Sequence, residues 1–181
     1  MLFRSGAIIR SATLRVTTTK SSLGGAENSV FAVHRVATAW DEMAVSWAAR
    51  TAGADWSVPG AASPADFSST PSSVAFVTVN GTYVFPSSQQ LVSEVQSFLD
   101  SPAGNFGWLL KTQSEATTRT ARQFGSRENA FSANQPLLVV AYDVPPTLTA
   151  LPVVNREFRL SFSAAANRTY VVEARDVLGG G

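Results

Sequence analysis

Alternation of apolar and polar residues with a period of two restricts the fold of this chain more than any other sequence feature. From Ala12 to Thr17 the even positions are Ala, Leu and Val, and the odd positions are Thr, Arg and Thr. This period places alternate side chains on opposite faces of a strand. Such segments, bounded by Gly, Pro, Ser or Asn, are residues 8–18, 30–38, 74–79, 82–85, 107–112, 122–126, 137–142, 157–162 and 169–175. We therefore expect an all-β fold.

The connections between these strands differ in length. Asn80 and Gly81 separate two strand segments and favour the positive φ angles of a two-residue type I′ turn. We therefore predict a β-hairpin there. Residues 50–73 are dominated by Gly, Ala, Ser and Pro, which indicates a long loop that contains Trp56.

One segment has the periodicity of a helix. Ser87 and Gln90 fit the S-x-x-Q capping box, and Leu91, Val95 and Phe98 recur at the spacing of one helix face. A proline at position 102 favours the end of the helix before it. The sequence therefore predicts a short helix that packs by one side.

A proline-rich stretch indicates the domain organisation. Residues 143–152 contain three prolines and no charge after Asp143, which is typical of an extended linker. We expect a jelly-roll-like antiparallel β-sandwich with one short helix over residues 1–143, a linker over 144–152 and a C-terminal β-hairpin extension over 153–181. This extension is a hairpin arm or the start of a second β-module, because two strands alone bury too little surface.

Composition limits the partners and the chemistry. Fourteen basic and thirteen acidic residues leave a net charge of +1, too little for the phosphate contacts of a nucleic-acid-binding protein. The absence of cysteine excludes disulfides, thiolate catalysis and sulfur-ligated metals. No apolar stretch is long enough to span a membrane. A surface rich in Ser and Thr but poor in Lys suits an exported protein, so we expect an extracellular or cell-surface location, with no export signal in this chain.

Four stretches form an ordered set of motifs. They are AIIRSATLRV at 7–16, VHRVATAWDEMAVSW at 33–47, LVSEVQSFLDSPAGNFGWLLK at 91–111 and FGSRENAFSANQPLLVVAY at 124–142. In this order they resemble the DNRLRE domain family, the disaggregatase-related repeat of bacterial and archaeal surface proteins. The resemblance implies a β-sandwich like a carbohydrate-binding module, with an adhesive, polysaccharide-binding or scaffolding role. The first strands of that family have no counterpart here, so we expect an incomplete domain.

The residues that could carry catalysis do not form a recognisable set. His34 is the only histidine and lies in a strand segment, and the chain has no G-x-S-x-G motif for a hydrolase nucleophile. Asp41 and Glu42 are adjacent and point to opposite sides if extended, which does not suit the paired carboxylates of a glycosidase. We therefore expect no enzymatic activity and no cofactor.

Charged residues within the motifs have a structural explanation. We predict that Glu42, Arg127 and Glu128 form buried or half-buried ion pairs that fix loops to the sheet, with Arg122 as another possible partner of the glutamates. A calcium ion held by Asp41, Glu42 and loop carbonyls lacks the support of a D-x-D-x-D spacing. We therefore expect no metal.

The aromatic residues are the best candidates for ligand binding. Sugar rings stack their apolar C–H faces on exposed indole and phenol rings. Trp47 and Trp108 lie in apolar contexts and are predicted to be core residues. Trp56 in the long loop is the first candidate for carbohydrate binding, followed by Trp40 and Tyr83, although Trp56 could equally anchor the loop in the core.

Several functions are compatible with these features. The first is a non-catalytic adhesive, polysaccharide-binding or scaffolding module, whose partners are polysaccharides or other β-modules of the same surface assembly. The alternative is a structural subunit of an extracellular fibre, in which a terminal strand of one protomer completes the sheet of its neighbour. A truncated sequence explains the unfinished ends equally well. An accessory domain of an enzyme is a further hypothesis.

Overall fold

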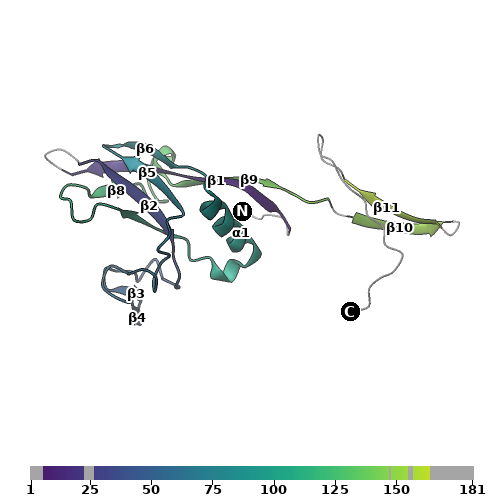
Figure 1. Cartoon of the computed structure of the whole chain (residues 1–181), viewed down its shortest axis with the longest axis horizontal. Coiled ribbons are helices and arrows are strands. Elements are labelled where there is room, and N and C mark those ends of the chain that lie inside the picture. Colours follow the sequence, from purple (N-terminus) through teal and green to yellow (C-terminus); the bar gives the residue numbers. More distant parts are fainter. Residues whose placement is uncertain (1–5, 23–26, 147, 155–156, 164–181) are drawn as a thin grey trace. The chain divides into compact units, whose positions relative to one another are not determined.

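The computed structural model describes residues 6–22, 27–146, 148–154 and 157–163 (Figure 1). The chain forms two compact units, Met1–Asp143 and Val144–Gly181. The first unit contains, in chain order, β1 (Ile8–Ser21), β2 (Ser29–Arg35), β3 (Ala49–Thr51), β4 (Ala54–Asp55), β5 (Ser73–Val77), β6 (Gly81–Phe85), α1 (Gln89–Asp100), the 3₁₀ helix η1 (Pro102–Gly104), β7 (Trp108–Thr112), β8 (Arg122–Phe124), the 3₁₀ helix η2 (Ser132–Asn134) and β9 (Leu137–Asp143). The second contains β10 (Leu148–Val154) and β11 (Glu157–Phe162).

Two antiparallel sheets pack face to face in the first unit. Sheet A has the order β6-β1-β8, with β9 also paired to β1, and sheet B has the order β5-β2-β7. Val16 and Phe85 of sheet A meet Phe31, Val33 and Val77 of sheet B in one buried hydrophobic cluster. This packing confirms the predicted all-β sandwich with a short helix. The jelly-roll topology stays a prediction.

Strand β1 is the centre of sheet A. Its residues 8–15 pair with β9, residues 14–18 pair with β6 on the opposite edge, and residues 18–21 pair with β8. The alternation predicted a strand as far as Thr18, and the β8 pairing extends it to Ser21. One long strand therefore connects almost all of sheet A.

Helix α1 packs against the end of β1 nearest the N-terminus. Leu91 and Val95 of the helix meet Ile9 and Ala12 of β1 in a second buried cluster. The helix begins one residue later than the capping box predicted, because the hydroxyl of Ser88 accepts the bond from the Leu91 N–H at 3.0 Å. The Ser87 hydroxyl instead accepts a bond from the Ala12 N–H at 3.1 Å. The neighbouring serine thus joins the helix to the sheet.

The predicted β5–β6 hairpin is wrong. Strand β5 pairs with β2 in sheet B, whereas β6 pairs with β1 in sheet A. Neither Asn80 nor Gly81 has the positive φ that a type I′ turn requires. Val77 and Phe85 reach the core from opposite sheets, so residues 78–80 carry the chain from one sheet to the other. The Tyr83 hydroxyl fixes this crossing because it donates to the Val79 carbonyl at 2.6 Å.

The second unit corrects the predicted linker and hairpin. Strand β10 occupies most of the expected 144–152 linker and pairs with β11, with Leu148 opposite Phe162 and Val154 opposite Glu157. The sequence predicted that 157–162 would pair with 169–175 instead. That second segment lies outside the described residues. No helix in the described ranges is long and apolar enough to cross a membrane.

Candidate functional site

The segment between β2 and β5, which we name the 37–72 loop, carries Trp40, Trp47 and Trp56, three of the four tryptophans. Part of it is regular, because β3 and β4 form a small antiparallel sheet at its lower end in Figure 1. Backbone hydrogen bonds from Trp56 N to Ala48 O at 3.0 Å and from Ser46 N to Ala49 O at 2.8 Å continue this order. The long loop predicted over residues 50–73 therefore contains a short two-stranded sheet and ordered backbone.

Asp66 organises the 37–72 loop. The residue is 4% exposed, and its carboxylate accepts bonds from the Ser57 N–H at 3.1 Å, the Ser57 hydroxyl and the Ala62 N–H at 2.8 Å. Burial by itself raises the pKa of Asp66. The hydrogen bonds from Ser57 and Ala62, with the charge of Arg50, outweigh burial, so that its pKa lies below the ordinary value of 3.8. An ionised carboxylate therefore ties the loop together at neutral pH.

Two of the tryptophans predicted to bind ligand also hold the loop. The indole N–H of Trp56 donates to the Ser46 carbonyl at 3.1 Å, and Trp56 is half-buried. The indole N–H of Trp40 donates to the Phe106 carbonyl at 2.8 Å, so the 37–72 loop is joined to the segment before β7. Trp40 remains 42% exposed. Trp56 therefore acts mainly as an anchor, whereas Trp40 offers surface to a ligand.

Trp47 differs from its predicted role. The sequence predicted a core residue, but Trp47 is 74% exposed. Its indole lies over Gly60, where the Cβ of any larger residue would fall 2.3 Å from the indole Cη2 atom. The Gly60 N–H donates to the Trp47 carbonyl at 2.6 Å, and Gly60 has φ of +88°. Trp47 is therefore the most exposed indole of the chain and is held against a glycine.

The other two aromatic predictions fall on the sandwich. Tyr83 is half-buried against the core cluster, and its hydroxyl is taken up by Thr78 and Val79. Trp108 packs on both hydrophobic clusters, as a predicted core residue should, and its indole N–H donates to the buried Glu94 carboxylate at 2.7 Å. Tyr83 thus lies at the crossing between the two sheets. It is separate from the 37–72 loop both in the sequence and in the contacts described here for its ring and hydroxyl.

The structure brings Glu42, Arg127 and Glu128 together. An Nη2 of Arg127 lies 2.8 Å from a Glu42 carboxylate oxygen, and Arg127 also pairs with Glu128. The hydrogen bond to Glu128 and the charges of both glutamates raise the pKa of Arg127, and the same bond lowers the pKa of Glu128. All three side chains are more than half exposed, which corrects the predicted burial. Arg122 instead donates to backbone carbonyls, including Thr78 O at 2.8 Å.

A pocket of about 350 Å³ lies beside the 37–72 loop. Its lining residues come from the end of β2, from the loop and from the segment before β7, and are Arg35, Val36, Ala37, Pro64, Ser68, Gly104 and Phe106. The Arg35 guanidinium lies 4.8 Å from the Phe98 ring centroid and donates from Nη2 to the Ser97 hydroxyl at 3.3 Å. No carboxylate of the described residues pairs with it. Arg35 is therefore half-buried, and its guanidinium has more N–H donors than its hydrogen bond to Ser97 uses.

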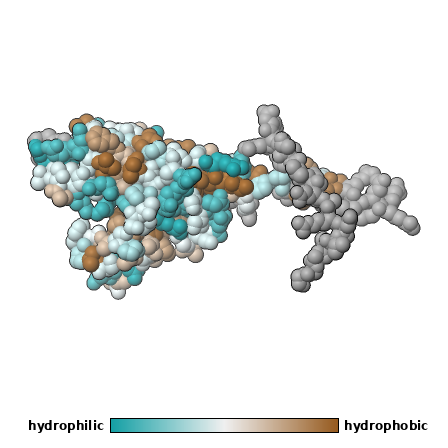
Figure 2. All heavy atoms as spheres, in the orientation of Figure 1, coloured by the Kyte–Doolittle hydropathy of each residue, from teal (hydrophilic) through white to brown (hydrophobic). Residues whose placement is uncertain are grey.

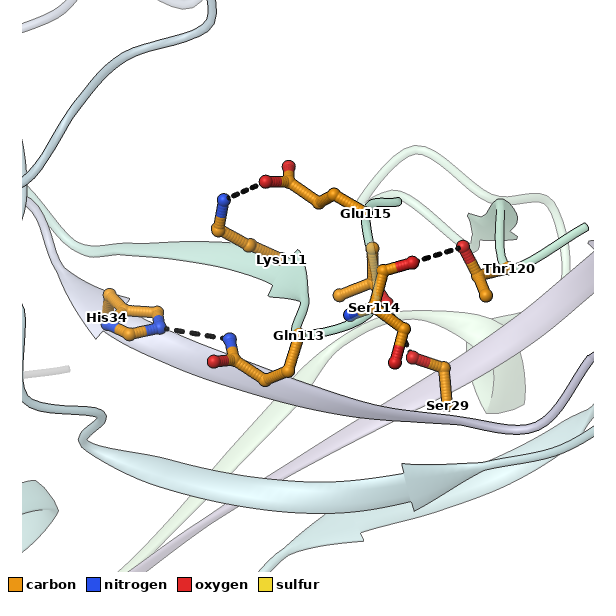
Figure 3. A network of polar contacts seen from close by, with 8 residues as sticks. Ser29, His34, Lys111, Gln113, Ser114, Glu115 and Thr120 are labelled. Atoms are coloured by element: carbon orange, nitrogen blue, oxygen red, sulfur yellow. Dashed lines mark hydrogen bonds and ion pairs between the residues drawn. The ribbon is translucent and has the colours of Figure 1, made fainter. Parts of the chain in front are cut away.

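His34 belongs to a polar network on sheet B (Figure 3). Its Nδ1 lies 2.9 Å from the Ser68 carbonyl and its Nε2 lies 3.4 Å from the Gln113 side-chain nitrogen. Lys111 pairs with Glu115 nearby, and Thr120 donates to the Ser114 carbonyl. One ring nitrogen of His34 thus faces a carbonyl and the other faces a side-chain amide, and His34 is 4% exposed. The network joins β2, β7 and the segment after β7.

The acidic residues proposed for calcium have other partners. A carboxylate oxygen of Asp41 accepts the Met43 N–H at 2.9 Å, and Glu42 pairs with Arg127. Among the described residues no three His, Asp or Glu side chains group closely enough to hold a metal ion.

Sequence reasoning missed Trp47, Asp66 and Arg35 as residues of this site. Arg35 had a visible signal, since it follows Phe31 and Val33 on the inward-facing positions of β2 and places a charge at the end of that row. Trp47 and Asp66 had no comparable signal, because their partners lie four to thirteen residues away within a loop that has no sequence periodicity. Comparisons with family models, curated proteins and solved structures gave no match. The resemblance to the DNRLRE family therefore stays a prediction.

Proposed function

We propose that this chain is a non-catalytic carbohydrate-binding module of an extracellular or cell-surface protein, and that the 37–72 loop is its binding surface. The observation that carries the proposal is Trp47, an indole that is 74% exposed and yet fixed over Gly60. A sugar ring stacks on such a surface through its apolar C–H face. Trp40, 42% exposed, supplies a second indole on the same loop.

The order of the loop favours binding. Asp66 and the indole of Trp56 hold the backbone through hydrogen bonds before any ligand arrives. A ligand then does not have to offset the entropic cost of ordering this loop. That cost is about 0.5–1.5 kcal/mol for each side chain that binding would otherwise immobilise. A preorganised aromatic surface is therefore well suited to a weakly interacting ligand such as a polysaccharide.

Arg35 suggests the kind of sugar. Arg35 and Phe106 both line the pocket, and Trp40 donates to the Phe106 carbonyl. A pocket of about 350 Å³ lies within the range of about 300–1,000 Å³ of small-ligand sites, towards its lower end. A guanidinium without an ion-pair partner matches a carboxylate through two parallel hydrogen bonds. We therefore favour glycans that carry acidic groups over neutral ones.

The test is binding of the full chain to a panel of neutral, uronate-containing and sulfated polysaccharides, followed by calorimetry on the best ligand. We expect Trp47→Ala and Trp40→Ala to weaken binding by about tenfold or more, since aromatic anchors dominate such interfaces. Arg35→Gln should weaken binding to acidic glycans and leave neutral ones unaffected. Phe76→Ala is the matched control, because Phe76 is an aromatic residue on β5 that is 59% exposed.

The outcomes separate the two parts of the proposal. No retention on any polysaccharide would overturn the carbohydrate-binding function. Binding that survives Trp47→Ala and Trp40→Ala would overturn the assignment of the loop. Equal loss with Phe76→Ala would show that exposed aromatic surface alone accounts for retention.

A fibre subunit is the second candidate function, and one observation favours it. The two-stranded sheet of β10 and β11 leaves large apolar side chains exposed, namely Leu148, Leu151, Leu160 and Phe162. A two-stranded sheet is marginally stable in water unless its apolar face is covered. Another protomer or β-module would cover it. Electron microscopy of the purified chain should then show ordered filaments, and a stable monomer would overturn this candidate.

A further inference from the structure

Two residues of helix α1 hold the guanidinium of Arg35. Its Nη2 donates to the Ser97 hydroxyl at 3.3 Å, and its Cζ lies over the Phe98 ring, 4.8 Å from the ring centroid. The face of an aromatic ring attracts a cation through its negative potential. Ser97 therefore restrains one edge of the guanidinium, and the Phe98 ring lies against it.

Phe98 is itself fixed by buried contacts. It is 8% exposed, and it meets Trp108 in an edge-to-face arrangement with the ring centroids 5.1 Å apart. The Trp108 indole N–H donates to one oxygen of the Glu94 carboxylate at 2.7 Å, and the Gln90 side chain donates to the other at 2.8 Å. Glu94 is 2% exposed. The ring under Arg35 is therefore held from within the fold.

This arrangement leaves one edge of the Arg35 guanidinium for a ligand. A guanidinium can bind a carboxylate with two parallel hydrogen bonds along either of two edges, Nε with Nη2 or Nη1 with Nη2. Ser97 takes one of the two Nη2 hydrogens, and each of these hydrogens belongs to a different edge. No other hydrogen bond or ion pair of the described residues uses this guanidinium. Whichever hydrogen Ser97 takes, the second edge keeps both of its donors.

Arg35 is the only charged residue among the described residues that line the pocket of about 350 Å³. The other lining side chain with a hydrogen-bonding group is Ser68, whose hydroxyl already donates to the Thr70 carbonyl at 3.1 Å. A lone cation matches a ligand group that carries one negative charge. Two parallel N–H donors match the planar shape of a carboxylate. The pocket therefore suits a carboxylate better than a group with two charges.

The apolar side chains of the 37–72 loop cannot make this distinction. Figure 2 shows hydrophobic atoms at the surface of the lobe that Figure 1 draws around β3 and β4, and the loop exposes Met43, Trp47 and Val58. Such side chains contact the C–H faces of a sugar ring. An acidic sugar and its methyl ester share these faces. A difference in affinity between the two must therefore come from charged groups such as Arg35.

We propose that Ser97 and Phe98 are positioning residues for Arg35, and that the guanidinium edge they leave free makes this module prefer glycans built of uronic acids. The inference rests on the proposed carbohydrate-binding function and names its substrate class. A guanidinium that is already held does not have to be immobilised by the ligand, so the carboxylate binds more tightly. Helix α1 thus sets the specificity of a site that the 37–72 loop presents.

The experiment is calorimetry of the full chain with polygalacturonate, with its methyl ester and with a sulfated dextran. We expect the wild type to prefer the free acid to both other ligands. Ser97→Ala should reduce the preference for acid over ester about fivefold, because the guanidinium loses one hydrogen bond that orients it. Ser97→Thr keeps a hydroxyl and should restore the preference. Ser93→Ala is the matched control, since Ser93 is an exposed serine of the same helix.

An NMR measurement tests the positioning without a polysaccharide. The ring current of Phe98 should displace the Arg35 side-chain signals, and Phe98→Leu should abolish this displacement. Ser97→Ala should reduce it, while Ser93→Ala should leave it unchanged. The monosaccharide glucuronate should move the Arg35 Nε–H signal of the wild type. If Phe98→Leu does not fold, Ser97→Ala decides, because it removes a single hydroxyl from a half-buried position.

The outcomes separate this inference from the function on which it rests. A preference for the acid that survives Ser97→Ala, or that Ser93→Ala reduces equally, would overturn the positioning role and leave carbohydrate binding in place. Equal affinity of the wild type for acid and ester, or tighter binding of the sulfated dextran, would refute the preference for uronic acids. Failure to bind any polysaccharide, combined with an Arg35 signal that responds to glucuronate, would refute the carbohydrate-binding function alone.

Discussion

The interior of the sandwich and the part of the 37–72 loop that carries the three tryptophans are ordered by different forces. In the interior, apolar side chains such as Phe85 and Val77 are fully buried between two sheets. In the loop, the carboxylate of Asp66 and the indole N–H groups of Trp40 and Trp56 hold the backbone, while Trp47 stays at the surface. Polar contacts order a segment without burying its aromatic side chains, so these stay available to a ligand. Apolar burial orders the interior by removing such side chains from the surface.

The largest effect should come from the interior. Phe85 is 0% exposed, and Phe85→Ala removes its contacts and leaves a cavity between the sheets. We expect a loss of about 3–5 kcal/mol in the free energy of unfolding, measured by denaturant titration. Phe76→Ala removes a ring that is 59% exposed and should cost much less. Similar losses for the two variants would contradict the assignment of the core.

Gly60→Ala tests the support of Trp47. A Cβ at this position would overlap the indole, and the φ of +88° is strained for any side chain. We expect about 1–3 kcal/mol of local strain, together with a changed environment of the Trp47 indole in NMR spectra. Gly53→Ala is the control within the same loop, because nothing lies within 4 Å of its Cβ position. An unchanged Trp47 signal in Gly60→Ala would show that the contact does not hold the indole.

Acid should loosen the loop before the interior. The pKa of Asp66 is lowered in the folded state, so ionised Asp66 contributes stability above its unfolded value, near 3.8, and loses it as the pH falls through the folded value. Amide signals of Ser57 and Ala62 should therefore shift as the pH falls below 3.8, with those of Val33 unchanged. Asp66→Asn should remove this pH response. A response that persists in Asp66→Asn would assign it to another group.

The smallest effect should come from the exposed ion pairs. Glu42 and Arg127 are both more than half exposed, so solvent and salt screen their attraction. We expect Glu42→Gln to leave the thermal unfolding midpoint unchanged within error. A clear drop in the midpoint would mean that this pair, rather than Asp66, fastens the 37–72 loop.

Sequence patterns predicted the strands better than their partners. Alternation located β1 and β2 because the side-chain period of a strand is a local property. The partner of β5 is set by distant contacts, and Asn80-Gly81 here lies at a crossing between the two sheets although this dipeptide favours hairpins. The helix was found from its apolar spacing, while its first residue depended on which of two serines meets the Leu91 N–H.

The proposed binding surface could be predicted only in part. From the sequence, Trp56 was the first ligand candidate, followed by Trp40, and Trp47 was predicted to be a core residue because burial was inferred from neighbouring residue types. Trp47 is 74% exposed and lies over Gly60, thirteen residues later in the 37–72 loop, and the residue types around it do not indicate either fact. The pairing of Glu42 with Arg127 was anticipated from the motifs, while its exposure follows from the position of both on surface loops. Side-chain exposure in loops is a property of tertiary contacts.

The most direct test of the account is native-state hydrogen exchange of Asp66→Ala beside the wild type. We expect the Ser57 and Ala62 amides to lose protection, which corresponds to a local opening free energy lower by about 1–3 kcal/mol, while Ala32 and Val33 in β2 keep theirs. Equal loss of protection in the loop and in β2 would show that both are one cooperative structure. Unchanged protection in the loop would show that Asp66 does not hold the surface that presents Trp47.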